Sequence, residues 1–332
     1  MAQAHYQVIA GMDEAGLGPI LGPLTLGYSA FALPQALSAD ALLAENLWQR
    51  MGGAIGRKPG ERKQRPVVCD SKQIYNPSRG LRPLEEELLS WACLHGFNVS
   101  SFEHFYASFC PLARERRGAY DWYAATLAPF PLQAGTGRAA LRAEALSRAL
   151  AQGGLALREL GAVPVFEGEL NRLIGRTDNK SKAEFEVVGR VVGELWRRHR
   201  HLAVVCDRQG GRERYGRALK SQFPEAEVSA FVESTKISSY ELVVPGERDE
   251  PRLFIAFVEE GDNDHLPVAL ASMAAKYLRE TMMQLFNDWF VARQPGLERT
   301  AGYYQDGRRF LQDTAELRRS LGLDDARLIR AR

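Results

Sequence analysis

The sequence predicts an α/β fold with a mainly helical insertion. Two observations lead to this class: apolar runs typical of strands occur in both halves of the chain, and a long amphipathic helical pattern stands directly before one of them. The 332 residues are 45% hydrophobic and 25% charged, as in an ordinary globular protein with a sizeable core. At roughly 150 residues per domain, this length corresponds to one large domain or two small ones.

The amino-terminal part is predicted to supply two strands and a helix. Residues 6–12 and 23–33 are rich in apolar side chains and predict the strands, and the glycines and prolines between them favour a tight turn. A basic, glycine-containing loop follows over 52–66, and the spacing over 84–92 predicts a helix.

The middle of the chain has a different character. Residues 139–160 are rich in Ala, Leu, Arg and Glu and predict a helix, whereas the prolines and glycines of 111–137 predict irregular structure. A short strand is expected at 163–167. We therefore expect one domain built from 1–104 and 163–332, interrupted by a helical insertion over 105–162.

The carboxy-terminal half returns to alternating helices and strands. Residues 182–199 predict a long amphipathic helix, 202–206 and 253–258 predict buried strands, and 266–290 predict a second long helix. Helices and strands that alternate in this way form the layers of an α/β protein.

Charge leaves the class of partner open. The net charge of +2 is too small to show a polyanionic partner and does not oppose one, because local patches matter more than the sum. The basic stretches at 57–65, 197–201 and 327–332 are each interpreted either as solvated surface or as a contact to a nucleic-acid backbone.

Cysteine usage and hydropathy favour a reducing compartment. The four cysteines show no metal-ligand spacing and are interpreted as reduced core thiols. The amino terminus lacks the pattern of a signal peptide, and no stretch approaches the roughly 20 apolar residues of a membrane span. We expect a cytoplasmic protein with no membrane partner.

Four acidic residues follow apolar runs. Asp13 and Glu14 come directly after the first run, where a turn would aim both toward one place, and Asp207 and Asp262 follow two later runs. A buried, unpaired carboxylate is costly, and a cation is the usual compensation. Carboxylates suit Mg²⁺, so these acids predict a divalent-metal site. Taken singly, Asp207 is also consistent with a helix cap, and Asp264 rivals Asp262.

Residues 11–19 read Gly-Met-Asp-Glu-Ala-Gly-Leu-Gly-Pro. This segment resembles the opening motif of type 2 ribonuclease H (ribonuclease HII), in which Arg or Lys stands where this chain has Leu17. Similar blocks follow in the family's order: Asp-Ser-Lys at 70–72, the strand that ends at Asp207, Gly-Asp at 261–262 with Ala-Ser-Met-Ala-Ala-Lys at 271–276, and Gly-Tyr at 302–303. The helical insertion lies outside the resemblance.

The resemblance implies a ribonuclease-H-like mixed sheet flanked by helices. It also implies hydrolysis of the RNA strand of RNA–DNA hybrids, or incision at ribonucleotides in DNA, with two Mg²⁺ or Mn²⁺ ions held by Asp13, Glu14, Asp207 and Asp262. Gly16, Leu17, Gly18 and Tyr303 match positions at which the family contacts its substrate. Lys72, Lys276 and Arg279 lie in the matched blocks and are candidates for further substrate contacts.

Leu17 is the main departure from the family's pattern. It removes a cation that would meet a phosphate, although the amides of Gly16 and Gly18 still donate hydrogen bonds. Two alternatives therefore stand beside a hybrid-specific nuclease: a related nuclease for another structured nucleic acid, and a relative that binds nucleic acid without cleaving it. The lysines, Arg279 and Tyr303 are also consistent with ordinary surface or core positions.

Overall fold

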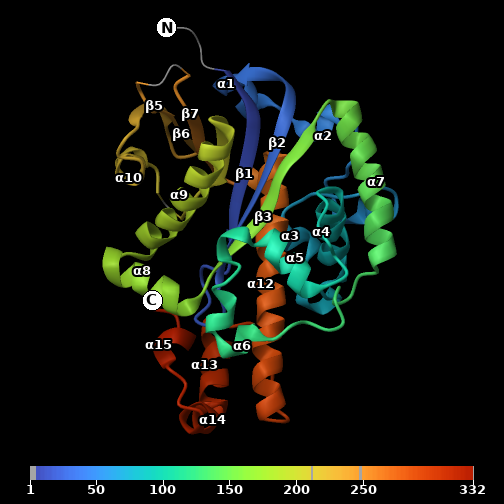
Figure 1. Ribbon diagram of the computed structural model, residues 1–332, viewed down its shortest axis with the longest axis vertical. Helices are drawn as coiled ribbons and strands as arrows, with labels where there is room; N and C mark the ends of the chain where they lie inside the picture. The colour runs from blue at the N-terminus through green and yellow to red at the C-terminus, as the bar shows by residue number, and fades with distance from the viewer. Residues whose placement is uncertain (1–4, 211, 247–248, 332) are drawn as a thin grey trace.

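The computed structural model describes residues 5–210, 212–246 and 249–331, and these fold around one sheet with the strand order β3-β2-β1-β4-β7-β6-β5 (Figure 1). Strands β1, β4 and β7 are parallel to one another, and the remaining pairs are antiparallel. The predicted fold class, a mixed sheet flanked by helices, is confirmed. The strands are β1 (His5–Ala15), β2 (Leu24–Ser38), β3 (Ala156–Val165), β4 (His201–Asp207), β5 (Glu227–Glu233), β6 (Ile237–Val243) and β7 (Arg252–Val258).

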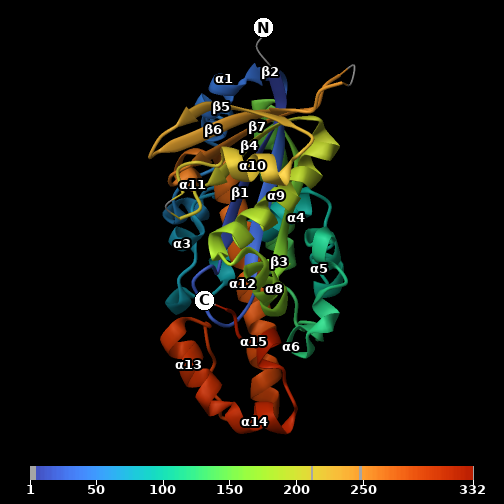
Figure 2. The same cartoon turned by 90° about the vertical axis from the view of Figure 1, so that its left-hand side faces the viewer.

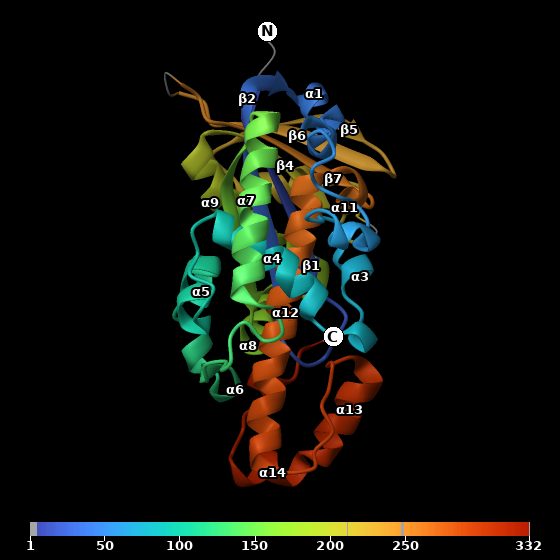
Figure 3. The same ribbon diagram turned by 90° about the vertical axis from the view of Figure 1, so that its right-hand side faces the viewer.

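Helices cover both faces of this sheet. Figure 2 shows the side with α8, α9 and α10, and Figure 3 shows the opposite side with α4, α7 and α12. The helices are α1 (Ala39–Ala44), α2 (Leu47–Arg50), α3 (Ser71–Ile74), α4 (Arg82–Leu94), α5 (Phe102–Phe109), α6 (Asp121–Ala124), α7 (Thr136–Gly153), α8 (Glu167–Thr177), α9 (Lys180–His199), α10 (Gly216–Gln222), α11 (Gly261–Asp264), α12 (Leu266–Arg293), α13 (Tyr304–Asp313), α14 (Ala315–Ser320) and α15 (Asp325–Leu328).

Strand β4 shows how the sequence supplies a core on each face. Successive side chains of a strand point to opposite faces. Ala203 and Val205 belong to the hydrophobic core that includes α12, whereas Val204 and Cys206 belong to the core that includes α9. A parallel strand between two helical layers is apolar on both sides, which is why residues 202–206 form a continuous apolar run.

Helix α12 is the central helix of the molecule. It runs along the sheet and continues beyond it beside α13 and α14 (Figures 1, 2 and 3). Glycines allow the close approach, because a Cβ atom added to Gly11 of β1 would lie 2.1 Å from the carbonyl carbon of Pro267. Within the part of the chain that the structure describes, no helix is both long and apolar enough to cross a membrane.

The prediction of a helix over 139–160 is wrong beyond Gly153. Helix α7 ends at Gly153, since Gly154 adopts a left-handed conformation with φ 65°. The chain then forms β3, which pairs with β2 along most of its length. Sheet pairing therefore overrides the helical composition of this segment. The expected boundary at 162 and 163 falls inside β3, and the division into a domain and an insertion stays a proposal.

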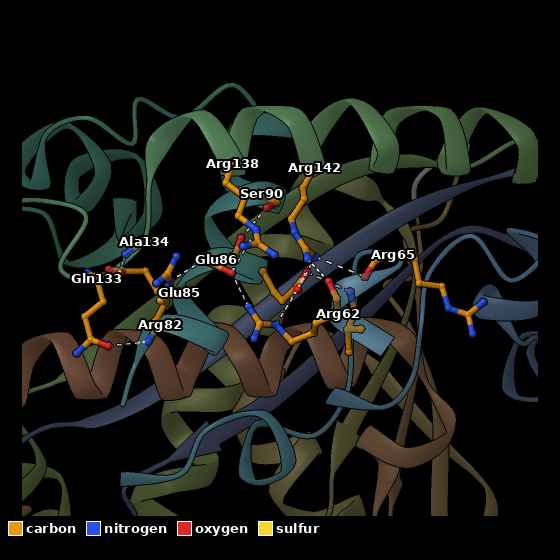
Figure 4. A network of polar contacts seen from close by, with 12 residues as sticks. Arg62, Arg65, Arg82, Glu85, Glu86, Ser90, Gln133, Ala134, Arg138 and Arg142 are labelled. Carbon is orange, nitrogen blue, oxygen red and sulfur yellow. Dashed lines mark hydrogen bonds and ion pairs between the residues drawn. The ribbon is translucent and has the colours of Figure 1, made fainter. Parts of the chain in front are cut away.

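The basic loop over 57–65 is largely tied to the protein itself. Arg62 donates to Glu86 at 2.6 Å and to Glu87 at 3.0 Å, and Arg142 of α7 donates to Glu87 at 2.5 Å. Figure 4 shows Arg62, Arg82, Arg138 and Arg142 gathered around the acidic stretch of α4. Glu87 is fully buried, so these arginines compensate a charge that would otherwise be costly. The network joins the loop, α4 and α7.

Candidate active site

The four predicted acids gather at one edge of the sheet. Asp13 and Glu14 stand near the end of β1, Asp207 ends the adjacent parallel strand β4, and Asp262 lies in α11 directly after β7. The carboxyl ends of parallel strands meet at the same edge, so residues distant in the sequence become neighbours there.

The two adjacent acids point to opposite faces of the sheet. Strand β1 continues through Ala15, so the expectation that a turn aims both side chains to one side is wrong. Asp13 forms a side-chain hydrogen bond with Ser272 of α12, whereas Glu14 interacts with Glu184 of α9. Both still interact with Asp207, and the site therefore straddles the end of the sheet.

Burial and mutual repulsion make the acids reluctant to ionise. Burial first, then the charges of Glu14 and Asp207, raises the pKa of Asp13 well above its ordinary value. Burial, followed by the charge of Glu184, raises the pKa of Glu14 to about 8. A cation bound at the site would stabilise the ionised forms of these acids.

The pKa values of the acids in the more exposed part of the site are also raised. Burial and the neighbouring Asp70 raise the pKa of Asp262 to about 7. Burial also raises the pKa of Asp207, against the hydrogen bond that its Oδ1 accepts from the amide of Gly261 at 3.0 Å. This last contact ties Asp207 to the first residue of α11, whose N-cap residue is Glu260 rather than Asp207.

Sequence reasoning missed two acids of this cluster. Asp70 accepts a hydrogen bond from the Lys72 amide at 2.9 Å, as a helix cap does, but its charge also raises the pKa of Asp262. Glu184 is 3% exposed, its Oε1 has no hydrogen-bond partner, and burial raises its pKa to about 7. The Asp-Ser-Lys block pointed to Asp70, whereas a single Glu within an amphipathic helix carries no signal of its own.

The donor chemistry of this cluster suits a hard divalent cation, because its side chains are carboxylates. In residues 5–210, 212–246 and 249–331, however, no three His, Cys, Asp or Glu side chains converge closely enough to bind a metal ion as they stand. The opposite directions of Asp13 and Glu14 are one physical reason.

Among the predicted substrate contacts, Lys72 faces the acids. Its burial acts to lower the pKa, but the negative charges around it, led by Asp70 and Asp13, outweigh burial and raise the pKa above the ordinary value. Tyr303 is 55% exposed at the start of α13. Both side chains are accessible to a ligand.

The other two basic residues are engaged within the protein. Lys276 donates to Glu280 at 2.6 Å and lies 4.5 Å from the centre of the Tyr75 ring. Arg279 is 2% exposed and donates to the carbonyl of Pro23 at 2.6 Å. The predicted contact of Arg279 with substrate is therefore replaced by a structural contact with the loop after β1.

That loop contains the predicted contacts Gly16, Leu17 and Gly18. Gly16 has φ 86°, and a Cβ atom there would lie 2.6 Å from Cδ of Arg279, so glycine is required. Leu17 is partly buried and Gly18 is exposed. The loop thus lies against Arg279 and leaves Gly18 exposed to solvent.

Cavities flank the acids on two sides. One, of about 310 Å³, is lined by Asp70 and Asp262 together with Arg57 and Lys58. Another, of about 490 Å³, borders Asp207 and is lined by residues of the loops after β4 and β7. A larger cavity, of about 620 Å³, lies between α9, α10 and the end of β3, and its described lining includes none of the four predicted acids.

The basic stretches differ in their surroundings. Arg57 and Lys58 face the smaller cavity beside the acids. In the stretch 197–201, by contrast, Arg198 and His199 both contact Glu159, and His201 contacts Asp249. The part of the 57–65 loop nearest the acids is therefore better placed than 197–201 to meet a polyanion.

Solved structures of ribonucleases HII and HIII match this chain at low similarity. A chain of the PCNA–RNase HII complex of Archaeoglobus fulgidus is 14% identical with a TM-score of 0.44, covering 98% of this chain and 94% of that chain. The ribonuclease H2 of Pyrococcus horikoshii OT3 is 14% identical with a TM-score of 0.45, covering 97% and 92%. Bst-RNase HIII in complex with Mn²⁺ is 12% identical with a TM-score of 0.41, covering 97% and 65%.

No family model and no curated protein matches the chain. Identities and TM-scores this low assign no activity, so the function must be argued from the residues at the edge of the sheet.

Proposed function

We propose that this protein is a metal-dependent endonuclease that hydrolyses the RNA strand of RNA–DNA hybrids. The supporting observation is the gathering of Asp13, Glu14, Asp207 and Asp262 at one sheet edge, where burial and mutual repulsion raise their pKa values. Acids in this state favour a bound cation, and these four residues would hold Mg²⁺ or Mn²⁺.

When bound there, the metal would supply an activated water and relief of charge on the phosphate. The protein's own groups prepare the site. The hydrogen bond with Ser272 orients the carboxylate of Asp13, and the amide of Gly261 orients Asp207. The ammonium group of Lys72 would contact a phosphate oxygen with a charge-assisted hydrogen bond. The products would carry 5′-phosphate and 3′-hydroxyl ends.

The basic side chains near the acids support a nucleic-acid substrate, and the resemblance of the motif at 11–19 supports an RNA–DNA hybrid as its class. A nucleic-acid backbone that reaches the acids would pass Arg57 and Lys58 beside the cavity and Lys72 next to it. Phosphate contacts of this kind make affinity fall with salt. DNA that contains single ribonucleotides is the second form of this substrate. A cytoplasmic location remains part of the proposal.

The experiment compares two neighbouring aspartates. Asp262→Asn is expected to lower hybrid cleavage about 100-fold or more, because a metal supplies several kcal/mol of charge stabilisation. Asp264→Asn is the matched control, since the side chain of Asp264 is 81% exposed. A labelled hybrid, a duplex with one ribonucleotide, and plain DNA and RNA duplexes are incubated with Mg²⁺, Mn²⁺ or EDTA. Cleavage of the hybrid in EDTA, or undiminished cleavage by Asp262→Asn, refutes the proposal.

A second candidate is a nucleic-acid-binding protein without catalysis. The opposite directions of Asp13 and Glu14 favour it. It predicts that the hybrid binds, as measured by fluorescence anisotropy, without turnover in any metal. A third outcome, cleavage of another duplex in the panel but not of the hybrid, identifies a related nuclease with a different structured substrate.

A further inference from the structure

The carboxy-terminal segment returns to the loop that follows β1. After α15, the backbone amide of Arg330 donates to the carbonyl of Ile20 at 2.9 Å. Its guanidinium donates to the carbonyl of Leu17 at 3.0 Å and also to that of Gly16. One residue near the end of the chain therefore binds three carbonyls of a loop near its beginning.

Other groups form hydrogen bonds with the rest of the same loop, residues 16–23, on its inner side. The carbonyl of Gly302 accepts hydrogen bonds from the amides of Ile20 at 2.8 Å and Leu21 at 3.2 Å. Glu167 accepts from the amide of Gly22 at 3.1 Å, and Arg279 donates to the carbonyl of Pro23 at 2.6 Å. Arg330 adds the contacts to Gly16 and Leu17, at the end of the loop that directly follows β1.

The outer side of the loop is open. Gly18 is exposed, and a Cβ atom added there would meet nothing within 4 Å. Gly18 stands four residues after Glu14, in the loop that follows β1. Backbone amides in loops of this kind bind phosphate oxygens and hydroxyl groups. The amides of Ile20, Leu21 and Gly22 donate inward and prolines have no N–H, so the amides considered for outward contacts are those of residues 16–18.

Arg330 itself is not available to a ligand. It is 3% exposed, and burial, followed by the charge of Arg279, lowers the pKa of Arg330 to about 10. A buried guanidinium is costly unless acceptors surround it, and the loop carbonyls are its acceptors only in this conformation. The position of the tail and the conformation of the loop therefore depend on each other.

We propose that Arg330 is a positioning residue, which holds loop 16–23 in the conformation that presents its outer amides to the nucleic-acid strand at the acids. This inference rests on the proposed function for the identity of the ligand. The geometry of the loop and the tail stands independently of it.

Three variants test the proposal: Arg330→Ala, Arg330→Lys and the control Arg327→Ala. Arg327 lies in the same tail, but it contacts the carbonyl of Ala119 and the ring of Tyr120 instead of the loop. Arg330→Ala is expected to raise amide exchange in residues 16–23 about tenfold, because one end of the loop loses its anchor. Arg330→Lys, which keeps the charge but not the forked geometry, is expected to give an intermediate rate.

Kinetics on the hybrid provide the second measurement. Loss of preorganisation is expected to raise KM about tenfold in Arg330→Ala, with kcat within about threefold of the original value. Arg327→Ala is expected to leave both loop exchange and KM within about twofold, since it leaves the loop contacts in place. If Arg330→Ala does not fold, as judged by its thermal unfolding, the same measurements on Arg330→Lys test the proposal.

The two proposals fail differently. Loop exchange needs no activity, so unchanged exchange in Arg330→Ala and Arg330→Lys overturns the positioning role whether or not the protein cleaves hybrids. Equal loosening of the loop in Arg327→Ala also overturns it, because the effect would then belong to the tail as a whole. A loosened loop in a protein that cleaves no substrate refutes the proposed function and supports the structural role of Arg330.

Discussion

Glu167 is a buried carboxylate whose titration should control stability. It is fully buried at the start of α8, where its Oε1 accepts hydrogen bonds from the hydroxyl of Tyr123 at 2.7 Å and from the amide of Gly22 at 3.1 Å. Its Oε2 has no hydrogen-bond partner. Burial outweighs these hydrogen bonds and raises the pKa of Glu167 to about 7, from the ordinary value of 4.5.

The direction of the effect follows from proton binding. Between pH 4.5 and 7 the folded protein holds a proton on Glu167 that the unfolded chain has released, so the free energy of unfolding falls as pH rises through this range. A rise of about 2.5 pKa units corresponds to about 3 kcal/mol. The contribution is complete below about pH 4.5 and absent above about pH 7.

The measurement is urea unfolding at pH 5 and pH 8 for the original protein, for Glu167→Gln and for Glu144→Gln. Glutamine cannot ionise, so the loss of stability between the two pH values should be about 3 kcal/mol smaller in Glu167→Gln. Glu144 is exposed on α7, and Glu144→Gln should retain the original pH dependence. An equal loss of stability in the original protein and in Glu167→Gln would show that the reasoning is wrong.

Three further predictions concern the network, the metal and the exposed tyrosine. Glu87→Ala should lower the free energy of unfolding, measured by urea titration, by about 3–5 kcal/mol, because it leaves Arg142 buried without its carboxylate. Glu61→Ala removes a partly exposed ion pair with Arg65 and should lower the same free energy by about 1 kcal/mol or less. Mg²⁺ at 100 times its Kd should stabilise the protein by about 2.7 kcal/mol and raise its Tm in calorimetry, and the absence of this rise in Asp13→Asn would identify Asp13 as a ligand. Tyr303→Ala should leave stability within about 0.5 kcal/mol but weaken hybrid binding by about 1–3 kcal/mol if its ring stacks on the substrate, as anisotropy titration would show.

The local sequence pattern correctly predicted the helices and strands that have long helical periodicity or continuous apolar runs. The runs at 6–12 and 202–206 lie in β1 and β4, and the pattern at 182–199 lies in α9. The pattern failed for the first part of β3, because its Ala, Leu, Arg and Glu composition is that of a helix and pairing with β2 makes it a strand, whereas the strand expected at 163–167 overlaps the end of β3. It also missed β5, whose side chains are mostly exposed and give no regular apolar alternation.

The sequence by itself determined which residues could form an acidic site, because carboxylates after apolar runs and the motif at 11–19 are local features. Only the tertiary structure decided how they act together. It places Asp13 and Glu14 on opposite faces of the sheet, brings Glu184 from α9 beside them, and buries Arg279 and Arg330 behind the glycine loop. The physical reason is that strand pleating and helix packing set side-chain direction and burial, and both depend on contacts between segments far apart in the chain.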